Sequence, residues 1–466
     1  MSAVDNGIHA EIKLAGFNSK HPVIVESTLR VETGRTVMVA GPSGTGKTLL
    51  LLAVTGVLKH FLNGVVEGSI SLNGLNPLDY SEYTRIPSEV GFIMQDPERQ
   101  IIYPTPLDEA TVVLEARGYS YEEARRKAFQ ILGTLGLAGK AEEHVENLSG
   151  GEKKRLAIAL SIIHDPRVLL LDEPSSSLDP NGVGLVKKII AEGKKKGCSI
   201  LLTEHKVEFF TDVVDEVYVL AERKIQALRK GFPVNYEKAV ECREASNSSG
   251  EVVIEARGLS VGYNTPLVRD VNMHVRRGEV VVLAGPNGSG KTTILRTLAG
   301  FIRPLEGEVK GGGRGVFYAP QNPDIAFIHG SVEKELLDVS RRTGVGFEEL
   351  VSMYPWFSEV RRLHPLRLSH GQRRWLTLLI SYAYGSRLMI LDEPTSGIDY
   401  ALYNRLIELL RELKLKKRGI LIATHDPRLI ADVADRVYVV GDGGVREADK
   451  CSVVEAMYKS ISRGYT

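Results

Sequence analysis

The chain has 466 residues, of which 43% are hydrophobic and 25% are charged, a balance typical of folded globular domains rather than of disordered chains. Its 59 basic and 58 acidic residues give a net charge of +1, which provides no strong positive field and argues against nucleic acid as a partner. No apolar run approaches the length of about 18 residues that crosses a bilayer, and the N-terminal MSAVDNGIHAEIK lacks the pattern of a secretory signal.

The first elements along the chain are a strand-like segment at 8–14 (IHAEIKL) and an apolar, β-branched strand at 36–40 (TVMVA). The second strand leads directly into GPSGTGKT and then into a helical stretch. In this context the glycines let backbone N–H groups turn around phosphate oxygens at a helix N-terminus. Lys47 would reach the β- and γ-phosphates, and Thr48 would place its hydroxyl on Mg²⁺. The predicted phosphate-binding residues are Gly41, Pro42, Ser43, Gly44, Thr45, Gly46, Lys47 and Thr48.

A further apolar strand, VLLLD at 168–172, ends in the acidic pair Asp172 and Glu173. Two unpaired carboxyl groups at the end of a buried strand would be costly without a cation. Asp172 therefore suits support of Mg²⁺, and Glu173 can polarise the attacking water as a general base.

The same pattern recurs after EASNSSGE at 244–251, a small and polar segment without periodicity that is typical of a linker. Lys47 and Lys291 are 244 residues apart, and the pairs Asp172/Asp392 and His205/His425 are each 220 apart. Spacing held this tightly indicates two copies of one domain. We predict an α/β chain with domains at 8–243 and 252–466. The second-copy site residues are Gly285, Pro286, Asn287, Gly288, Ser289, Gly290, Lys291, Thr292, Thr293, Asp392 and Glu393.

LSGGE at 148–152 and LSHGQ at 368–372 resemble the signature of ATP-binding cassette proteins, the ATPase subunits of ABC transporters. The resemblance covers nearly the whole chain, twice. It implies two tandem P-loop NTPase domains, each with a mainly parallel sheet, a small antiparallel β region and a helical signature subdomain. It also implies that the halves pair head to tail, with each ATP and its Mg²⁺ between one P-loop and the other signature. The signature residues are Ser149, Gly150, Gly151, Ser369, His370 and Gly371.

The resemblance assigns further roles by position. Gln95 and Gln321 match the Q-loop glutamine, which contacts Mg²⁺ and senses the transmembrane partner, and His205 and His425 match the histidine that contacts the γ-phosphate. The aromatic that stacks on adenine is Tyr263, with Phe17 as its counterpart although the spacing to the P-loop is two residues longer there. Asp179 and Asp399 match the D-loop. The implied catalytic set is Glu173, Glu393, His205, His425, Gln95 and Gln321, and the metal set is Thr48, Gln95, Asp172, Thr292, Gln321 and Asp392.

The two copies differ in two ways that predict unequal sites. From the P-loop lysine to the Q-loop glutamine the first copy has 48 residues and the second 30, and we expect the missing part in the small antiparallel β region. In the second copy His370 replaces the first glycine of the signature.

QDPERQ at 95–100 and QNPD at 321–324 resemble the Q-loops of energy-coupling-factor importers, which take up vitamins or transition-metal ions. This implies a transmembrane scaffold, a small substrate-binding membrane protein and a place on the cytoplasmic face of the membrane. Asp96, Glu98 and Asp324 would accept arginines of the scaffold. The alternatives are a fused sugar-type importer ATPase and a soluble, ribosome-acting ABC ATPase. The scattered Cys198, Cys242 and Cys451 predict ordinary thiols in a reducing compartment. Nothing in the chain encodes the transported substrate.

Overall fold

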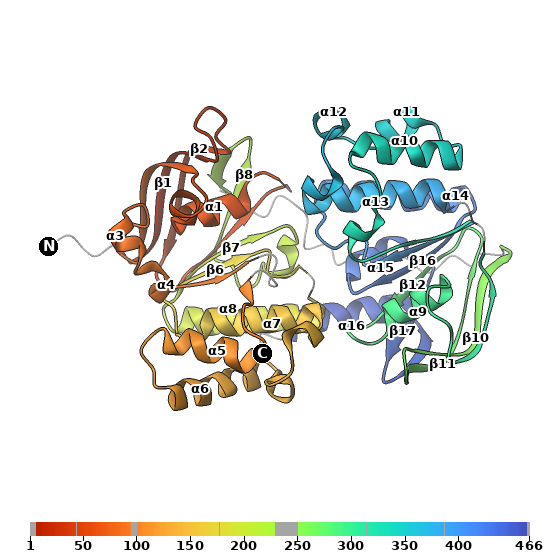
Figure 1. The fold of residues 1–466 in the computed structure, drawn as a ribbon, viewed down its shortest axis with the longest axis horizontal. Helices are drawn as coiled ribbons and strands as arrows, with labels where there is room; N and C mark the ends of the chain where they lie inside the picture. Colours follow the sequence, from red (N-terminus) through yellow and green to blue (C-terminus); the bar gives the residue numbers. More distant parts are fainter. Residues whose placement is uncertain are drawn as a thin grey trace. The chain divides into compact units, whose positions relative to one another are not determined.

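The computed structural model describes residues 6–42, 44–94, 100–176, 178–228, 250–313, 315–385 and 387–463. The chain divides into two compact units, unit 1 (Met1–Glu237 with Ile461–Thr466) and unit 2 (Lys238–Ser460). Figure 1 shows in each unit a twisted sheet covered by helices. The proposed linker at 244–251 lies almost wholly outside the described residues, so its boundaries stay a prediction.

Unit 1 contains two sheets. The larger has the order β5-β6-β7-β3-β8-β9, in which all neighbours are parallel except β8 and β9. Its strands are β5 (Val90–Ile93), β6 (Val168–Asp172), β7 (Ser199–Glu204), β3 (Thr36–Ala40), β8 (Glu216–Ala221) and β9 (Lys224–Ala227). The smaller sheet is antiparallel, in the order β2-β1-β4, with β2 (Ile24–Glu32), β1 (Gly7–Gly16) and β4 (Val65–Leu72). The central strands are buried on both faces, which explains their continuous apolar sequences.

The helices of unit 1 connect these strands. They are α1 (Lys47–Val54), α2 (Val57–His60), α3 (Tyr80–Tyr83), α4 (Ile86–Glu89), α5 (Pro106–Glu115), α6 (Tyr121–Thr134), α7 (Gly150–Ile162) and α8 (Pro180–Lys195). Short 3₁₀ turns occur at Ala138–Lys140, Val145–Asn147 and Val207–Phe209. Helices α5, α6 and α7 lie between β5 and β6 in the sequence, and contacts among them form the helical subdomain that the resemblance implies.

Unit 2 repeats this plan. Its larger sheet has the order β14-β15-β16-β12-β17-β18, with β14 (Val316–Ala319), β15 (Leu388–Asp392), β16 (Gly419–Thr424), β12 (Val280–Ala284), β17 (Arg436–Gly441) and β18 (Gly444–Ala448). The smaller sheet contains β11 (Pro266–Arg276), β10 (Val252–Gly262) and β13 (Glu306–Gly311). The helices are α9 (Lys291–Leu298), α10 (Val332–Thr343), α11 (Phe347–Ser352), α12 (Phe357–Val360), α13 (His370–Tyr384), α14 (Tyr400–Leu415), α15 (Pro427–Val433) and α16 (Lys450–Arg463), with 3₁₀ turns at Pro323–Ala326 and Pro365–Arg367. The predicted fold class is confirmed.

The extra length of the first copy lies elsewhere than expected. Both small antiparallel sheets keep three strands. The difference arises mainly after the third strand, where unit 1 runs through residues 73–89 with α3 and α4, whereas unit 2 needs only residues 312–315 to reach β14. The prediction that the missing part belongs to the antiparallel β region is therefore wrong, since the second copy lacks a helical connection and keeps the sheet.

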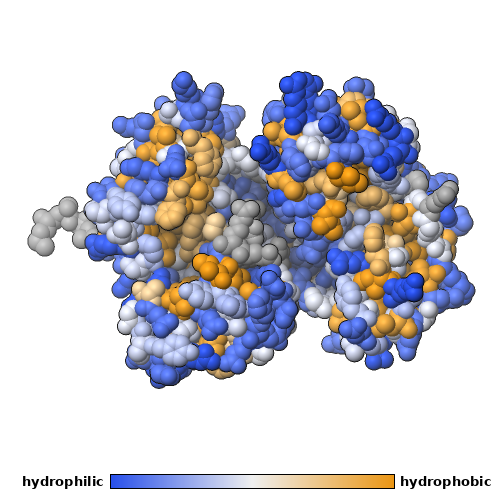
Figure 2. Space-filling view, in the orientation of Figure 1, coloured by the Kyte–Doolittle hydropathy of each residue, from blue (hydrophilic) through white to orange (hydrophobic). Residues whose placement is uncertain are grey.

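The exterior of the protein bears on the expectation that the chain has no membrane-spanning segment. No helix among the described residues has the length and apolar character needed to span a membrane, and Figure 2 shows hydrophobic residues interspersed among hydrophilic ones on the visible face.

Cys198 is a buried free thiol, as expected. Cys451, in contrast, is disulfide-bonded, so the expectation of three ordinary thiols is wrong for this residue.

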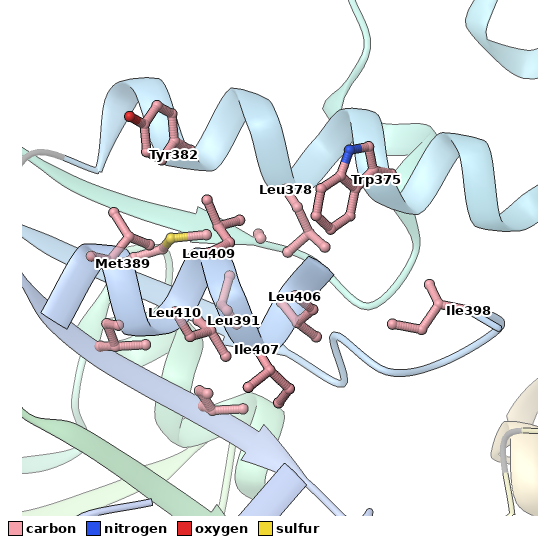
Figure 3. Close-up of a cluster of buried hydrophobic side chains, with 14 of the residues drawn as sticks. Trp375, Leu378, Tyr382, Met389, Leu391, Ile398, Leu406, Ile407, Leu409 and Leu410 are labelled. Carbon is pink, nitrogen blue, oxygen red and sulfur yellow. The ribbon is translucent and has the colours of Figure 1, made fainter. Parts of the chain in front are cut away.

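The core of unit 2 illustrates how the helical subdomain is fixed to the sheet. In Figure 3 the side chains of Trp375 and Leu378 on α13 point toward those of Leu406 on α14 and Leu391 on β15. All four are buried. Removing this much apolar surface from water is worth about 25 cal/mol per Å², so α13, which carries the second signature at its N-terminus, is anchored along its length.

Candidate active sites

Each predicted phosphate-binding loop connects a central strand to the helix that follows it, β3 to α1 and β12 to α9. The glycine before each lysine is left-handed, with φ of 103° at Gly46 and 100° at Gly290. A Cβ on Gly46 would lie 2.4 Å from Val23 Cγ1, and one on Gly290 would lie 2.5 Å from Val268 Cγ2. Both backbone conformation and packing therefore require glycine here. Ser43 lies outside the described residues.

The lysine of each loop is buried and is held over the loop by backbone oxygens. Lys47 Nζ donates to the Gly41 and Pro42 carbonyl oxygens, both at 2.9 Å. Lys291 Nζ repeats this with Gly285 and Pro286, at 2.7 and 2.8 Å. The ammonium group thus lies inside the curve of the loop, next to the N-terminus of the helix, where both the charge and the backbone amides favour an anion.

Asp172, at the end of β6, receives a hydrogen bond on each carboxylate oxygen. Thr48 Oγ1 donates at 2.8 Å and Thr203 Oγ1 donates at 2.7 Å. Burial is the largest influence on this carboxyl group and raises its pKa, to which the neighbouring Glu173 adds. A nearby cation would stabilise the ionised form of a carboxyl group that burial disfavours in this way.

Asp392 occupies the equivalent place at the end of β15 but has one different partner. Thr292 Oγ1 donates to it at 3.1 Å, as Thr48 does in unit 1. The second donor is Tyr318 on β14, whose hydroxyl lies 2.9 Å from Asp392 Oδ2, because Ala423 replaces Thr203. Burial raises the pKa of Asp392, and it also raises the pKa of Tyr318, so the phenol keeps the proton that it donates.

The two glutamates that follow these aspartates share an uncommon backbone conformation. Glu173 has φ of 46° and Glu393 has φ of 48°. A left-handed residue other than glycine costs about 1–3 kcal/mol and persists only where the surroundings enforce it. Here the amide of Glu173 donates to the Thr203 carbonyl oxygen at 3.1 Å, and that of Glu393 to the Ala423 carbonyl oxygen at 2.9 Å. The same strain in both units turns each carboxylate out of the sheet.

Each glutamate pairs with the predicted histidine of its own unit. His205 Nε2 lies 2.5 Å from Glu173 Oε1, and His425 Nδ1 lies 2.8 Å from Glu393 Oε1. Lys47 Nζ lies 3.2 Å from His205 Nε2 and 3.9 Å from Glu173 Oε1. Burial, the largest influence, raises the pKa of both glutamates, but the histidine and the loop lysine together outweigh it and lower the pKa. Both carboxylates are therefore ionised, as a general base requires.

The donor set fits magnesium bound together with phosphates. Among the described residues, no group of three or more His, Cys, Asp or Glu side chains could hold a metal ion by itself. Mg²⁺ commonly takes only one or two protein oxygens and completes its shell with phosphate oxygens and water. Thr48 with Asp172, and Thr292 with Asp392, supply such oxygens beside a phosphate-binding loop.

The signature residues begin the long helices α7 and α13. Ser149 and Ser369 are the N-caps, and each forms a capping box, with Glu152 and Gln372 respectively. Within the described part of each unit, no hydrogen bond or ion pair joins Ser149 or Ser369 to the P-loop of the same unit. Gly150, Gly151, His370 and Gly371 lie in the first turns of these helices.

His370 packs against the D-loop of its own unit. A Cβ on Gly397, two residues before Asp399, would lie 2.1 Å from His370 Cδ2 and 2.7 Å from His370 Nε2. In the sequence of unit 1 the equivalent positions hold Gly150 and Ser177, of which Ser177 lies outside the described residues. His370, which departs from the family pattern, is therefore accommodated by a glycine at 397. Asp179 and Asp399 themselves are N-caps of α8 and α14.

A buried cation on each signature helix reaches the start of the Q-loop. Lys154 Nζ donates to the Met94 carbonyl oxygen at 3.2 Å, and Lys154 has no exposed surface. At the equivalent place Arg374 Nη1 donates to the Pro320 carbonyl oxygen at 2.8 Å and Nη2 to that of Gln321. These contacts fix the end of β5 or β14 to the helix.

The Q-loop residues are only partly described. Gln95, Asp96, Glu98 and Arg99 lie outside the described residues. Gln321 is exposed, and its side chain makes no hydrogen bond to Asp392 or Thr292 among the contacts of the described residues. Asp324 is bound within its own unit, because Arg373 Nη1 lies 2.8 and 2.9 Å from its two oxygens. With 38% of its side chain exposed, Asp324 could accept an arginine of another chain only beside Arg373 or in its place, and that expectation stays a prediction.

The two aromatic residues assigned to adenine occupy equivalent places. Tyr263 directly follows β10, and Phe17 directly follows β1. Their exposed fractions are 67% and 62%, so both rings are accessible. The longer spacing to the P-loop in unit 1 does not alter the position of Phe17 relative to its strand.

Sequence reasoning did not identify Thr203, Tyr318, Lys154 and Arg374 as parts of these sites. Tyr318 lies in the strand VFYA, where a tyrosine is an ordinary sheet residue. Lys154 and Arg374 lie within the basic runs KKR at 153–155 and RR at 373–374, where the sequence does not distinguish the buried cation from its less buried neighbours.

Comparison with known proteins agrees with this geometry. The family model described as ABC transporter matches residues 25–176 and 268–396. A protein of Methanosarcina mazei, provisionally described as an ABC transporter ATP-binding protein, is 28% identical over 92% of both chains. One of Sulfurisphaera tokodaii with the same description is 31% identical over 92% of this chain and 94% of its own.

A Bacillus subtilis protein provisionally described as an HMP/thiamine import ATP-binding protein is 26% identical over 96% of this chain and 92% of its own. Among solved structures, an RNase-L inhibitor matches with a TM-score of 0.66 at 21% identity, covering 92% of this chain and 89% of its own. Both matched ranges of the family model contain one complete P-loop and one acidic pair. The chain therefore belongs to the ABC transporter family, as an ATP-binding protein with two ABC ATPase domains in tandem.

Proposed function

We propose that both units hydrolyse ATP, with Lys47 and Lys291 binding the phosphates. The observation that carries this proposal is the strained glutamate–histidine pair that recurs in both units. Bound Mg²⁺ would neutralise charge on the phosphates, held by Asp172 with Thr48 in unit 1 and by Asp392 with Thr292 in unit 2. Glu173 and Glu393 would accept the proton of the attacking water.

In this scheme the histidine orients the base. His205 and His425 each bind the glutamate that must take up the proton, so the carboxylate is kept in one position and ionised. Tyr263 and Phe17 would stack on the adenine, since both rings are exposed directly after equivalent strands. Gln95 and Gln321 would complete the metal shell.

We further propose that the chain is the motor of a membrane importer of the energy-coupling-factor type, working with a transmembrane scaffold and a small substrate-binding membrane protein. The resemblance of both Q-loops supports it, and so does the relative whose description names HMP/thiamine import. A vitamin is accordingly the first substrate class to test.

Exposed apolar side chains beside the Q-loops support the proposal that a membrane protein binds there. Ile102 and Ile328 each lie seven positions after the Q-loop glutamine, and their exposed fractions are 82% and 81%. Single exposed apolar side chains are common on protein surfaces, but here the same residue type is left exposed at the same position in both units. Since Asp324 is paired with Arg373, we propose that Ile102 and Ile328, rather than Asp324, contact the scaffold.

The double variant Ile102→Asp/Ile328→Asp tests this surface. We expect it to keep basal ATP hydrolysis within about threefold, because both side chains are largely exposed and neither belongs to a P-loop. We expect it to lose copurification with membrane proteins and substrate uptake, because two charges would enter an apolar contact. Leu415→Asp is the matched control, since Leu415 is 83% exposed at the end of α14. Normal uptake by the double variant would contradict the proposed surface.

A ribosome-acting role is the second candidate, because solved structures with TM-scores of 0.66 and 0.68 bear the descriptions RNase-L inhibitor and archaeal ribosome recycling factor. At 21% and 20% identity these likenesses show the fold alone. Copurification from native cells separates the candidates. We expect integral membrane proteins with the chain, and ribosomal subunits in their place would favour the second candidate. A fused sugar-type importer would instead be recognised by the transported substrate.

A further inference from the structure

Tyr318 connects the acidic pair of unit 2 to the periphery of the site. Its hydroxyl donates to Asp392 Oδ2 at 2.9 Å, and the Arg296 guanidinium lies near the phenol oxygen. Its ring contacts Phe301, with the ring centroids 5.6 Å apart. The phenol is therefore fixed through both its hydroxyl group and its ring.

Arg296 extends this connection to Tyr263. Arg296 lies in the last turn of α9, the helix that begins at the P-loop lysine. Its Nη1 donates to the Tyr263 hydroxyl oxygen at 3.4 Å. Arg296 thus lies near the hydroxyl groups of both Tyr263 and Tyr318, all within unit 2.

Unit 1 lacks the counterparts of Arg296 and Tyr318. The positions of Arg296 and Tyr318 are occupied by Leu52 and Phe92, neither of which can donate a hydrogen bond. The second donor to Asp172 is instead Thr203, on the neighbouring strand β7. In unit 2 the residue paired in register with Asp392 is Ala423, in the place of Thr203. The two units therefore fix the same carboxylate from opposite neighbouring strands.

We propose that Tyr318 is a positioning residue for the magnesium carboxylate of unit 2, and that Arg296 couples its position to Tyr263 and hence to the adenine. This inference rests on the role proposed above for Asp392. A carboxylate that receives hydrogen bonds from Thr292 and Tyr318 on separate oxygens has one orientation, and residues that orient metal ligands typically change metal affinity about 10–100-fold when removed. Tyr263 accepts a hydrogen bond from Arg296, so a base stacked on Tyr263 would bias the orientation of Asp392 through Arg296 and Tyr318.

The test measures how the affinity for a fluorescent ATP analogue depends on free Mg²⁺ in the full chain. A background of Lys47→Ala and Glu393→Gln confines binding to unit 2 and prevents turnover there. In this background, Tyr318→Phe is expected to raise about tenfold the Mg²⁺ concentration that gives half of the full gain in nucleotide affinity. Nucleotide affinity in EDTA should be unchanged. Adding Ala423→Thr, which installs the donor of unit 1, should restore most of the loss.

Two further variants complete the test. Arg296→Met should leave the Mg²⁺ dependence of inorganic triphosphate binding unchanged. It should reduce the difference in Mg²⁺ dependence between the binding of ATP and that of triphosphate, because the link to the base is cut. In unit 1, with Lys291→Ala and Glu173→Gln, Thr203→Ala should reproduce the effect of Tyr318→Phe. Unchanged Mg²⁺ dependence in Tyr318→Phe would overturn the inference, as would failure of Ala423→Thr to rescue it.

Asp392→Asn in the same background separates this inference from the proposed function. If it abolishes the Mg²⁺ dependence while Tyr318→Phe has no effect, the magnesium role of Asp392 stands and only the positioning role of Tyr318 falls. If Asp392→Asn itself leaves the Mg²⁺ dependence unchanged, the proposed metal site of unit 2 is wrong.

Discussion

Replacing Glu173 and Glu393 together by Gln is expected to reduce steady-state ATP hydrolysis by at least about 100-fold and to leave ATP binding intact. Glutamine matches the size of glutamate and can still bind the histidine, but it cannot accept the proton of water. The loss therefore falls on kcat and not on affinity. Phosphate release measures turnover, and equilibrium binding of ATP with Mg²⁺ measures affinity.

The single variants show how ATP turnover is divided between the two units. If both sites turn over, Glu173→Gln and Glu393→Gln each lower the rate, whereas a single variant with the parental rate would assign turnover to the other unit. Glu216→Gln, an exposed carboxylate at the start of β8, controls for the loss of one charge. Undiminished hydrolysis in the double variant would exclude both glutamates as bases.

Replacing Gly397 by Ala is expected to lower the stability of unit 2 by about 3 kcal/mol. A left-handed residue with a Cβ costs about 1–2 kcal/mol, and φ at Gly397 is 69°. Overlap with the His370 ring, 2.1 Å from the added carbon, contributes the rest, since overpacking costs about 1–3 kcal/mol. Chemical denaturation of the full chain, followed by the fluorescence of Trp356 and Trp375, both of which lie in unit 2, measures the change.

Gly344→Ala separates backbone strain from overlap. Gly344 has φ of 77°, and an added Cβ would meet nothing within 4 Å, so this variant should show the strain alone. His370→Gly combined with Gly397→Ala should return the cost to that of Gly344→Ala, and the cycle gives the coupling energy between the two positions. Additive effects of His370→Gly and Gly397→Ala would mean that the ring does not depend on the missing side chain.

The sequence allowed the tandem organisation, both P-loops and both acidic pairs to be predicted, because each depends on a local pattern. Strand, glycine loop and helix follow one another within residues 36–54. The partners of the acidic pairs could not be predicted in the same way. Whether Thr203 or Tyr318 binds the aspartate depends on which of two flanking strands carries the donor, and that choice appears only when β5, β6 and β7 lie side by side.

The site of the extra residues in unit 1 was misjudged for a related reason. A difference of length between two fixed motifs does not say which connection contains it, and the short helices α3 and α4 have too few residues for a helical period to be recognised. The His370 and Gly397 pair could have been suspected, since both positions differ between the copies, but their contact requires the turn before α14.

The buried cations on α7 and α13 join each signature helix to the end of a strand in the large sheet. The Lys154 ammonium donates to the Met94 carbonyl oxygen, just after β5. The Arg374 guanidinium is a planar fork that donates to two successive carbonyl oxygens just after β14. A rotation of either signature helix would therefore carry the start of the Q-loop of its own unit with it, so that motion at the signature is transmitted to that loop.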